Sequence, residues 1–468
     1  MSVELDLYTG KLTYKDIEFD FVFDKSELRL IPPKDKIRET CKWFENELQP
    51  GVYTFGDPVC IEDPFLKAKI NETEQTMIIF THKNNVGYYN HVLTVQVDCY
   101  MINKTDVEYI DRIGFRSTEI DYIYSTNRAL CWPMCEDDGT VSIKTTKFDG
   151  TVSEKQSFKV NDKMVSVYFG ITRTTRLKEG EPPLELHSMM YFEFEKTNDY
   201  SFITNLWSIA KSFIQFLCYR QNVGLPESVI SAPLENGKHY SVATFYVVGE
   251  TKTVEPNTLS KGRYIRQQYI AGSEGKILDD IASNNLYQRH IPLSYEQGCS
   301  IDASRFVMIT AAFEWEFKRS YPDGVLKKES TIEAENEATI ELEKLIDGST
   351  GKLKKKYQFL KKLIKSDSLQ SEIEQIGKDY ADIINLFGNH LYSLNGEVLK
   401  YSEMGKRLSA QRNHFAHGDI DKEFIGNSLL DLIFLEYVIY AMQLKRYDIS
   451  DDSIKKIINE LFHCSFAL

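Results

Sequence analysis

The fold of the C-terminal part is decided by the stretch Leu429-Leu430-Asp431-Leu432-Ile433-Phe434-Leu435-Glu436-Tyr437-Val438-Ile439-Tyr440-Ala441-Met442, in which nearly every residue is apolar. A helix that is apolar around most of its circumference is surrounded by other elements. We therefore expect the helix that contains this stretch, 422–446, to be buried on most sides or to lie in a subunit interface.

The segments around this stretch also have helical patterns, with almost no strand signal after Ser304. We expect helices at 304–321, 329–346, 352–364, 369–391, 396–414, 422–446 and 453–462. Helices in succession with short connections are typical of a bundle. The C-terminal part is therefore predicted to be all-α.

The first 200 residues have the opposite character. Short segments rich in β-branched and aromatic residues alternate with polar turns, which is typical of strands in a sandwich or a partly open barrel. The clearest segments are 17–23, 77–81, 92–100, 165–172 and 189–194. Two further strands are expected at 240–248 and 264–270.

One helix interrupts this β-rich part. Its apolar residues follow steps of four and three, the spacing of one helical face: Phe202, Leu206, Ile209, Phe213 and Phe216. Asn198 or Asp199 is available as the N-cap. A polar stretch at 282–298 then leads to the helical part. The chain is thus predicted to be an α+β multidomain protein, with a β-rich domain at 1–285, open to subdivision near residue 225, and an all-α domain at 299–468.

The composition and net charge of the chain limit the classes of function that it can have. Hydrophobic residues make up 42% and charged residues 27%, the profile of a folded soluble protein, and no run of 18 apolar residues is present. The start lacks the features of a signal peptide, so we expect a cytoplasmic protein without a membrane partner. The net charge of −13 argues against non-specific coating of nucleic acid, so any RNA contact should be focal.

The sequence has no phosphate-binding GxxxxGK[ST] loop, no GxSxG elbow and no HExxH zinc motif, which argues against the common hydrolase classes. We predict no cofactor and no metal. Cys131 and Cys135 are spaced one residue wider than a CxxC pair; ordinary buried thiols are the preferred interpretation, and metal binding stays open.

The segment that carries chemistry is Arg412-Asn413-His414-Phe415-Ala416-His417, at the predicted end of a helix. Arginine offers a planar fork for phosphate oxygens, and histidine titrates near neutrality, so it serves as a general base or acid. Asn413 and His417 are four residues apart and share a helix face. Asn413 is therefore placed to orient the phosphate or the imidazole, while His414 either assists or packs.

Next to this segment, Gly418 is suited to end the helix, and Asp419 or Asp421 is suited to cap the next one.

The spacing of Arg412 and His417, with a polar residue after the arginine, resembles the Rx4–6H signature of the HEPN superfamily. The resemblance implies a metal-independent endoribonuclease in which Arg412, Asn413 and His417 are catalytic. It also implies a homodimer or higher homo-oligomer, in which two motifs face each other across a shared cleft. HEPN domains often keep an acidic residue on the first helix, and Glu314 is our choice for it. Glu316 is better placed to pair with Arg319, and a solvated face is an alternative for Glu314.

The order of a β-rich half, a connecting helix and a helical bundle resembles ApeA-type anti-phage defence proteins. This resemblance implies abortive infection: a phage-derived trigger is sensed through the N-terminal domain, and host or phage RNA, such as tRNA, is cut. Two alternatives stay open. One is a non-catalytic module that dimerises or binds a ligand, and the other is the toxin of a toxin–antitoxin pair.

A lysine-rich segment is a second candidate for RNA contact. The run 352–365 has seven lysines and no acid, and its RNA-backbone candidates are Lys354, Lys355, Lys356, Lys361 and Lys362. The alternative is that these lysines pair with the preceding acidic helix, which contains Glu333, Glu337, Glu341 and Glu343.

Overall fold

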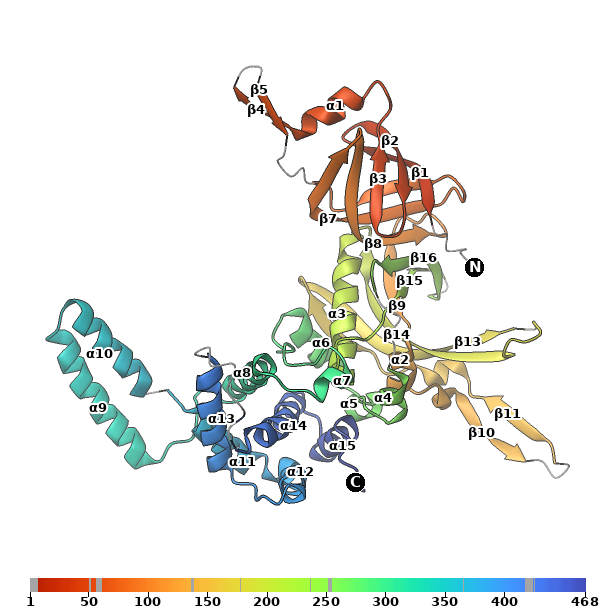
Figure 1. Ribbon diagram of the computed structural model, residues 1–468. Coiled ribbons are helices and arrows are strands. Elements are labelled where there is room, and N and C mark those ends of the chain that lie inside the picture. Colours follow the sequence, from red (N-terminus) through yellow and green to blue (C-terminus); the bar gives the residue numbers. More distant parts are fainter. Residues whose placement is uncertain are drawn as a thin grey trace. The chain divides into compact units, whose positions relative to one another are not determined.

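The computed structural model describes residues 7–49, 52–55, 61–135, 139–176, 178–235, 237–250, 255–364, 366–416, 424 and 426–468. The chain divides into two compact units (Figure 1). The first unit comprises Met1–Ser260 and Arg266–Leu286, and the second comprises Lys261–Ile265 and Tyr287–Leu468. Among the described residues, no helix combines the length and the apolar character needed to cross a bilayer.

The first unit begins with a closed barrel, which in the described part of the chain has six antiparallel strands. They are β1 (Tyr8–Tyr14), β2 (Ile17–Phe23), β3 (Glu27–Ile31), β6 (Leu66–Ile70), β7 (Thr76–Tyr89) and β8 (Val92–Asn103). Alternate residues point inward; in β2 these are Ile17, Phe19, Phe21 and Phe23. Between the two forms that the sequence left open, a sandwich and a partly open barrel, the structure therefore has a barrel, and it is closed.

A second antiparallel sheet continues from the barrel through β8. The first part of β8 pairs with β3, while its last residues, Cys99–Asn103, pair with the next strand along the sheet. The remaining strands, in sheet order from β8, are β16 (His239–Val247), β15 (Glu227–Pro233), β9 (Ile110–Phe115), β14 (Leu184–Thr197), β13 (Lys163–Thr175) and β12 (Gln156–Val160). Strand β8 thus belongs to both the barrel and the second sheet.

Helices and hairpins complete this unit. The helices are α1 (Ile37–Cys41), α2 (Thr118–Ile123), α3 (Ser201–Cys218), α4 (Pro256–Ser260), α5 (Gln267–Ile270) and α6 (Glu274–Ala282). The hairpins are β4 (Glu45–Gln49) with β5 (Val52–Phe55), and β10 (Leu130–Cys135) with β11 (Val141–Thr145).

The predicted helix is α3, and all five residues of its predicted apolar face are buried. Its N-cap is Tyr200, so neither predicted cap, Asn198 or Asp199, is correct; Asp199 does accept a hydrogen bond from the Ser201 N–H at 3.1 Å. A buried ion pair follows its C-terminal end, where Arg220 Nη2 donates to Glu119 Oε1 at 2.8 Å.

The second unit is helical, as predicted. Its helices are α7 (Tyr295–Gly298), α8 (Ala303–Ser320), α9 (Glu329–Asp347), α10 (Gly351–Ile364), α11 (Leu369–Asp379), α12 (Ala381–Leu394), α13 (Tyr401–Ala416), α14 (Ser428–Arg446) and α15 (Asp451–Leu461). Helix α14 contacts α8, α12, α13 and α15, and every residue from Phe434 to Leu444 is buried. The expectation from its sequence, burial on most sides, is confirmed.

Polar residues on α14 are buried with partners from the surrounding helices. Asp431 accepts hydrogen bonds from Arg407 Nε and Nη2 of α13, both at 2.7 Å, and another from the Tyr392 hydroxyl. Glu436 accepts one from Arg305 Nη2 of α8 at 2.7 Å. These ion pairs fix how α8 and α13 lie against α14, because an unpaired buried charge is strongly destabilising.

Two expectations about elements were wrong. The segment 369–391 forms two helices, because the backbone of Tyr380 leaves the α-helical region (φ −108°, ψ 11°). The segment 264–270 is not a strand: it runs through an irregular stretch into the short helix α5, and the boundary between the two units falls within it.

Candidate functional site

Helix α13 positions the motif. Its buried face consists of Met404, Leu408, Gln411 and Phe415, at steps of four, three and four residues. The ring of Phe415 packs edge-on against Phe306 of α8 at 5.3 Å, which anchors the last turn. Arg412, Asn413 and His414 lie beside this buried face.

Arg412 is turned toward α8. Its Nη1 donates to Glu314 Oε1, and the two side chains form an ion pair. The Arg412 side chain is 38% exposed and that of Glu314 is 20% exposed, so this pair contributes little to stability. Its effect is to orient the guanidinium. The structure therefore brings together Arg412 and the acidic residue chosen on the first bundle helix.

The two residues that follow Arg412 differ in their exposure to solvent. Asn413 is exposed and His414 is half-buried. His417 and Gly418 lie outside the described residues, so their predicted roles stay predictions. The predicted cap of the next helix, Asp419 or Asp421, was wrong: α14 begins at Ser428, and its N-cap is Asn427.

Glu316 faces the interior of the bundle. Its Oε2 accepts a hydrogen bond from Arg446 Nη2 at 3.1 Å, and its Oε1 accepts one from Gln443 Nε2 at 3.2 Å. Burial raises the pKa of Glu316, and the charges of Arg446 and Arg319 oppose this. Two residues of α14, Gln443 and Arg446, thus donate hydrogen bonds to Glu316. The Arg319 charge also acts on Glu316, and the pairing of these two residues stays a prediction. The sequence did not reveal the α14 partners, because local spacing does not show which face of α8 meets α14.

Glu372 of α11 is a third carboxyl group at this site, and the sequence did not single it out. It is 6% exposed, and its Oε2 has no hydrogen-bond partner among the described residues. Burial and the nearby Glu314 carboxylate raise the pKa of Glu372 to about 7, and the Arg412 charge acts in the opposite direction. Lys318 also lowers this pKa, and Asp367 raises it. Glu372 therefore exchanges its proton near neutrality, close to the Arg412–Glu314 pair.

A close helix contact holds α11 beside α13. A Cβ atom on Gly405 would lie 2.5 Å from the Cα of Gln370, so only glycine permits this approach. The sequence does carry a signal for Glu372: it adjoins Leu369, Ile373 and Ile376, the buried apolar face of α11. A charged residue at such a position has to be paired or neutral.

The lysine candidates lie on α10, which packs on α9. Lys361 forms an ion pair with Glu343 of α9, as the alternative interpretation predicted for the group. Lys355, Lys356 and Lys362 are exposed and Lys354 is half-buried; the described residues provide none of these four with an ion pair.

The cysteine pair remains an open prediction. Cys131 is exposed on β10, and the side chain of Cys135 lies outside the described residues. Within the described ranges, no three His, Cys, Asp or Glu residues are grouped as metal ligands would be.

The described site can thus bind an anion at Arg412 if the anion displaces Glu314, and it can exchange a proton at Glu372. Comparison of the chain with protein-family models, with curated proteins and with solved structures gave no match. The case for a function therefore rests on the motif and on this arrangement of side chains.

Proposed function

We propose that the chain is a metal-independent endoribonuclease with a HEPN-type helical domain, acting in anti-phage defence by abortive infection in the cytoplasm. The observation that carries the proposal is the environment of Arg412. This residue starts an RNxxxH motif near the end of a bundle helix, and a carboxylate from another helix directs its guanidinium. The β-rich unit would then sense infection and restrain the helical unit.

The proposed reaction needs three roles. A base removes the proton from a ribose 2′-OH, an acid protonates the departing 5′-oxygen, and a cation stabilises the charge on the phosphorane. His417 suits either proton-transfer role, and Arg412 suits the third. Asn413, exposed beside Arg412, would orient the phosphate.

One arginine and one histidine are too few for all three roles. Two copies of the motif facing each other would supply both a base and an acid, so the proposed active site is shared by two chains. In a single chain, Glu314 neutralises Arg412; RNA phosphate must therefore compete with this carboxylate. Glu314 would in this way keep the arginine oriented until RNA binds.

The test is RNA cleavage by the full chain in excess chelator. Wild type should produce fragments that end in a 2′,3′-cyclic phosphate, the product of 2′-OH attack. Arg412→Ala and His417→Ala should each lower the rate by about 100-fold or more, the contribution typical of a general acid–base group. The matched control is His463→Ala, because His463 is an exposed histidine just after another helix of the same unit.

Three results would count against the proposal. They are wild-type activity in His417→Ala, cleavage that disappears with chelator, and an absence of RNA cleavage under every activating condition. The last result would favour a non-catalytic module that dimerises or binds a ligand. Inhibition by a cognate antitoxin would instead place the same ribonuclease in a toxin–antitoxin pair.

A further inference from the structure

Helices α9 and α10 form a hairpin, the α9–α10 hairpin, in which each helix packs chiefly on the other (Figure 1). The hairpin has almost no core of its own. In α9 only Thr339 and Ile346 are buried, and α10 has no buried residue. Because helices derive most of their stability from packing an apolar face, this hairpin leaves much of its packing potential unused.

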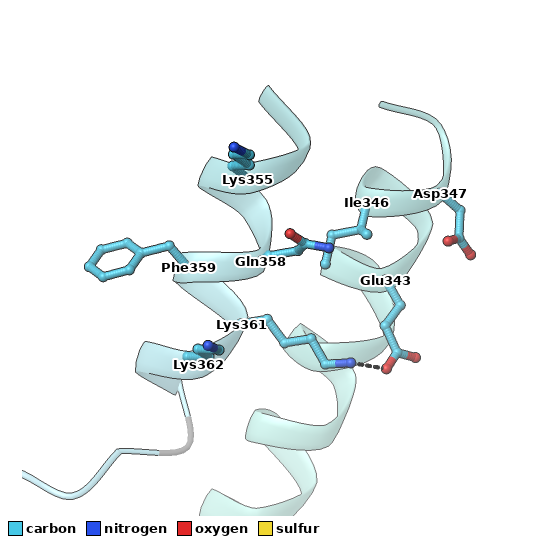
Figure 2. A pocket seen from close by; sticks show the side chains of 8 residues that line it. All are labelled: Glu343, Ile346, Asp347, Lys355, Gln358, Phe359, Lys361 and Lys362. Carbon is cyan, nitrogen blue, oxygen red and sulfur yellow. Dashed lines mark hydrogen bonds and ion pairs between the residues drawn. The ribbon is translucent and has the colours of Figure 1, made fainter. Parts of the chain in front are cut away.

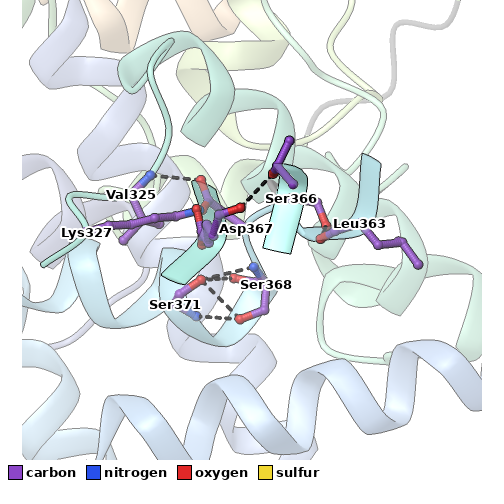
Figure 3. Close-up of polar contacts among 9 residues, drawn as sticks. Val325, Lys327, Leu363, Ser366, Asp367, Ser368 and Ser371 are labelled. Carbon is purple, nitrogen blue, oxygen red and sulfur yellow. Dashed lines mark hydrogen bonds and ion pairs between the residues drawn. The ribbon is translucent and has the colours of Figure 1, made fainter. Parts of the chain in front are cut away.

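The base of the hairpin is held by polar contacts (Figure 3). Asp367, just after α10, accepts a hydrogen bond from the Val325 N–H at 2.8 Å and forms an ion pair with Lys327 at 3.3 Å. Ser368 and Ser371 form a capping box at the start of α11. The two ends of the hairpin are thereby tied together where they join the bundle.

Large apolar side chains are exposed along both helices. Each of the seven is between 45% and 61% exposed: Ile332, Ile340, Leu345, Leu353, Phe359, Leu360 and Leu363. Scattered single exposures need no explanation, but this many on one short hairpin indicate a surface that is covered by a partner.

The charges of the two helices are opposite. Seven acidic residues and one lysine give α9 a net charge of −6, while six lysines and no acid give α10 a net charge of +6. The hairpin as a whole is therefore neutral but strongly polarised from one helix to the other.

The two charged edges meet at a groove of about 1050 Å³ (Figure 2). Glu343, Ile346 and Asp347 line it from α9, and Lys355, Gln358, Phe359, Lys361 and Lys362 line it from α10. Figure 2 shows Lys361 bridging to Glu343, while Phe359 points away from α9. The groove face thus presents chiefly charged side chains, acidic from α9 and basic from α10.

We infer that the α9–α10 hairpin pairs with the same hairpin of a second copy, with α9 of each chain lying on α10 of the other. A two-fold axis parallel to the helices produces this arrangement. It places the acidic helix of each chain over the basic helix of the other chain. The four helices then form an antiparallel bundle in which each acidic helix meets a basic one.

RNA fits this face less well than a second copy does. Helices that pack together lie about 8–10 Å apart, which is close to the Debye length of about 8 Å at physiological salt. Phosphates drawn to α10 would therefore also meet the acids of α9. This inference does not depend on the ribonuclease proposal.

The test uses charge reversal and the mass of the full-length assembly, measured by sedimentation. One variant reverses the groove face of α10 (Lys355→Glu with Lys362→Glu), and the other reverses that of α9 (Glu343→Lys with Asp347→Lys). Each variant alone places like charges opposite each other, so its assembly should have about half the wild-type mass. An equimolar mixture of the two should regain the wild-type mass, because every contact across the interface is again complementary.

The matched control combines all four substitutions in one chain. This chain contains every substitution of both variants, so any loss of stability that they cause is present in it. It keeps opposite charges across the interface, so it should assemble as wild type does. Wild-type mass in either variant alone, or no association in the mixture, would overturn the inference. Loss of RNA binding in the α10 variant without a change in mass would overturn it in favour of RNA.

Discussion

Glu372→Gln should stabilise the helical unit at alkaline pH and have no effect at acid pH. The Glu372 carboxyl is buried on α11 near Glu314, and its pKa in the folded protein is about 7, against an ordinary value of 4.5. The folded state therefore binds the proton more tightly than the unfolded state does. Glutamine has nearly the same shape as the protonated acid and carries no charge at any pH.

The size of the effect follows from these two values. The stabilisation by protonated Glu372 is complete below pH 4.5 and is lost as the pH rises through about 7. Each pKa unit corresponds to about 1.4 kcal/mol, so wild type loses about 3 kcal/mol that the variant keeps. The difference in unfolding free energy between the two proteins should thus rise from near zero at pH 4.5 to this value at pH 8.

Amide hydrogen exchange is the suitable assay, because it reports on α11 and α13 separately from the β-rich unit. At pH 8, protection of these helices in Glu372→Gln should exceed that of wild type by about two orders of magnitude. Comparison at equal pH cancels the intrinsic exchange rate. The control is Glu374→Gln on the same helix, whose carboxylate is half-buried and accepts a hydrogen bond from Gln370. Equal protection of wild type and Glu372→Gln at both pH 5 and pH 8 would refute the reasoning.

Three further substitutions test the packing. Asp431→Ala should lower the unfolding free energy by about 3–5 kcal/mol, measured in urea, because it leaves the Arg407 guanidinium without its buried carboxylate. Gly405→Ala should lower it by about 1–3 kcal/mol, because the new methyl group collides with the Gln370 backbone; an unchanged urea midpoint would contradict this contact. Arg220→Ala should destabilise the β-rich unit by about 3–5 kcal/mol while leaving protection of the helical unit unchanged.

Local periodicity predicted much of the fold. The alternation in 17–23 matches β2 residue for residue, and the apolar steps from Phe202 to Phe216 match the buried face of α3. The burial of α14 follows from its own composition. In each of these segments, the local sequence pattern is sufficient to predict the element and its buried residues.

Features that depend on distant pairing were not predictable in this way. Closure of the barrel depends on β8 pairing with both β3 and β7, which alternation within a strand does not specify. The misassigned strand at 264–270 has β-forming residues, but contacts elsewhere decide its conformation.

The candidate site was also only partly predictable from the sequence. The motif placed Arg412 near a helix end, and the structure adds its carboxylate partner, Glu314. Glu372 was missed because its environment comes from α8 and α13, helices that are distant in the sequence. Only a folded bundle shows which acidic side chains share the surroundings of one arginine.

Because β8 is shared by the barrel and the second sheet, it affects how the first unit unfolds. The same strand closes the barrel and begins the second sheet, so peeling either layer away breaks ladder hydrogen bonds of β8. The two layers should therefore open as one cooperative block, with the amides of Val92–Asn103 among the last to exchange. Such a block transmits a pull or a twist at one layer to the other without a hinge between them.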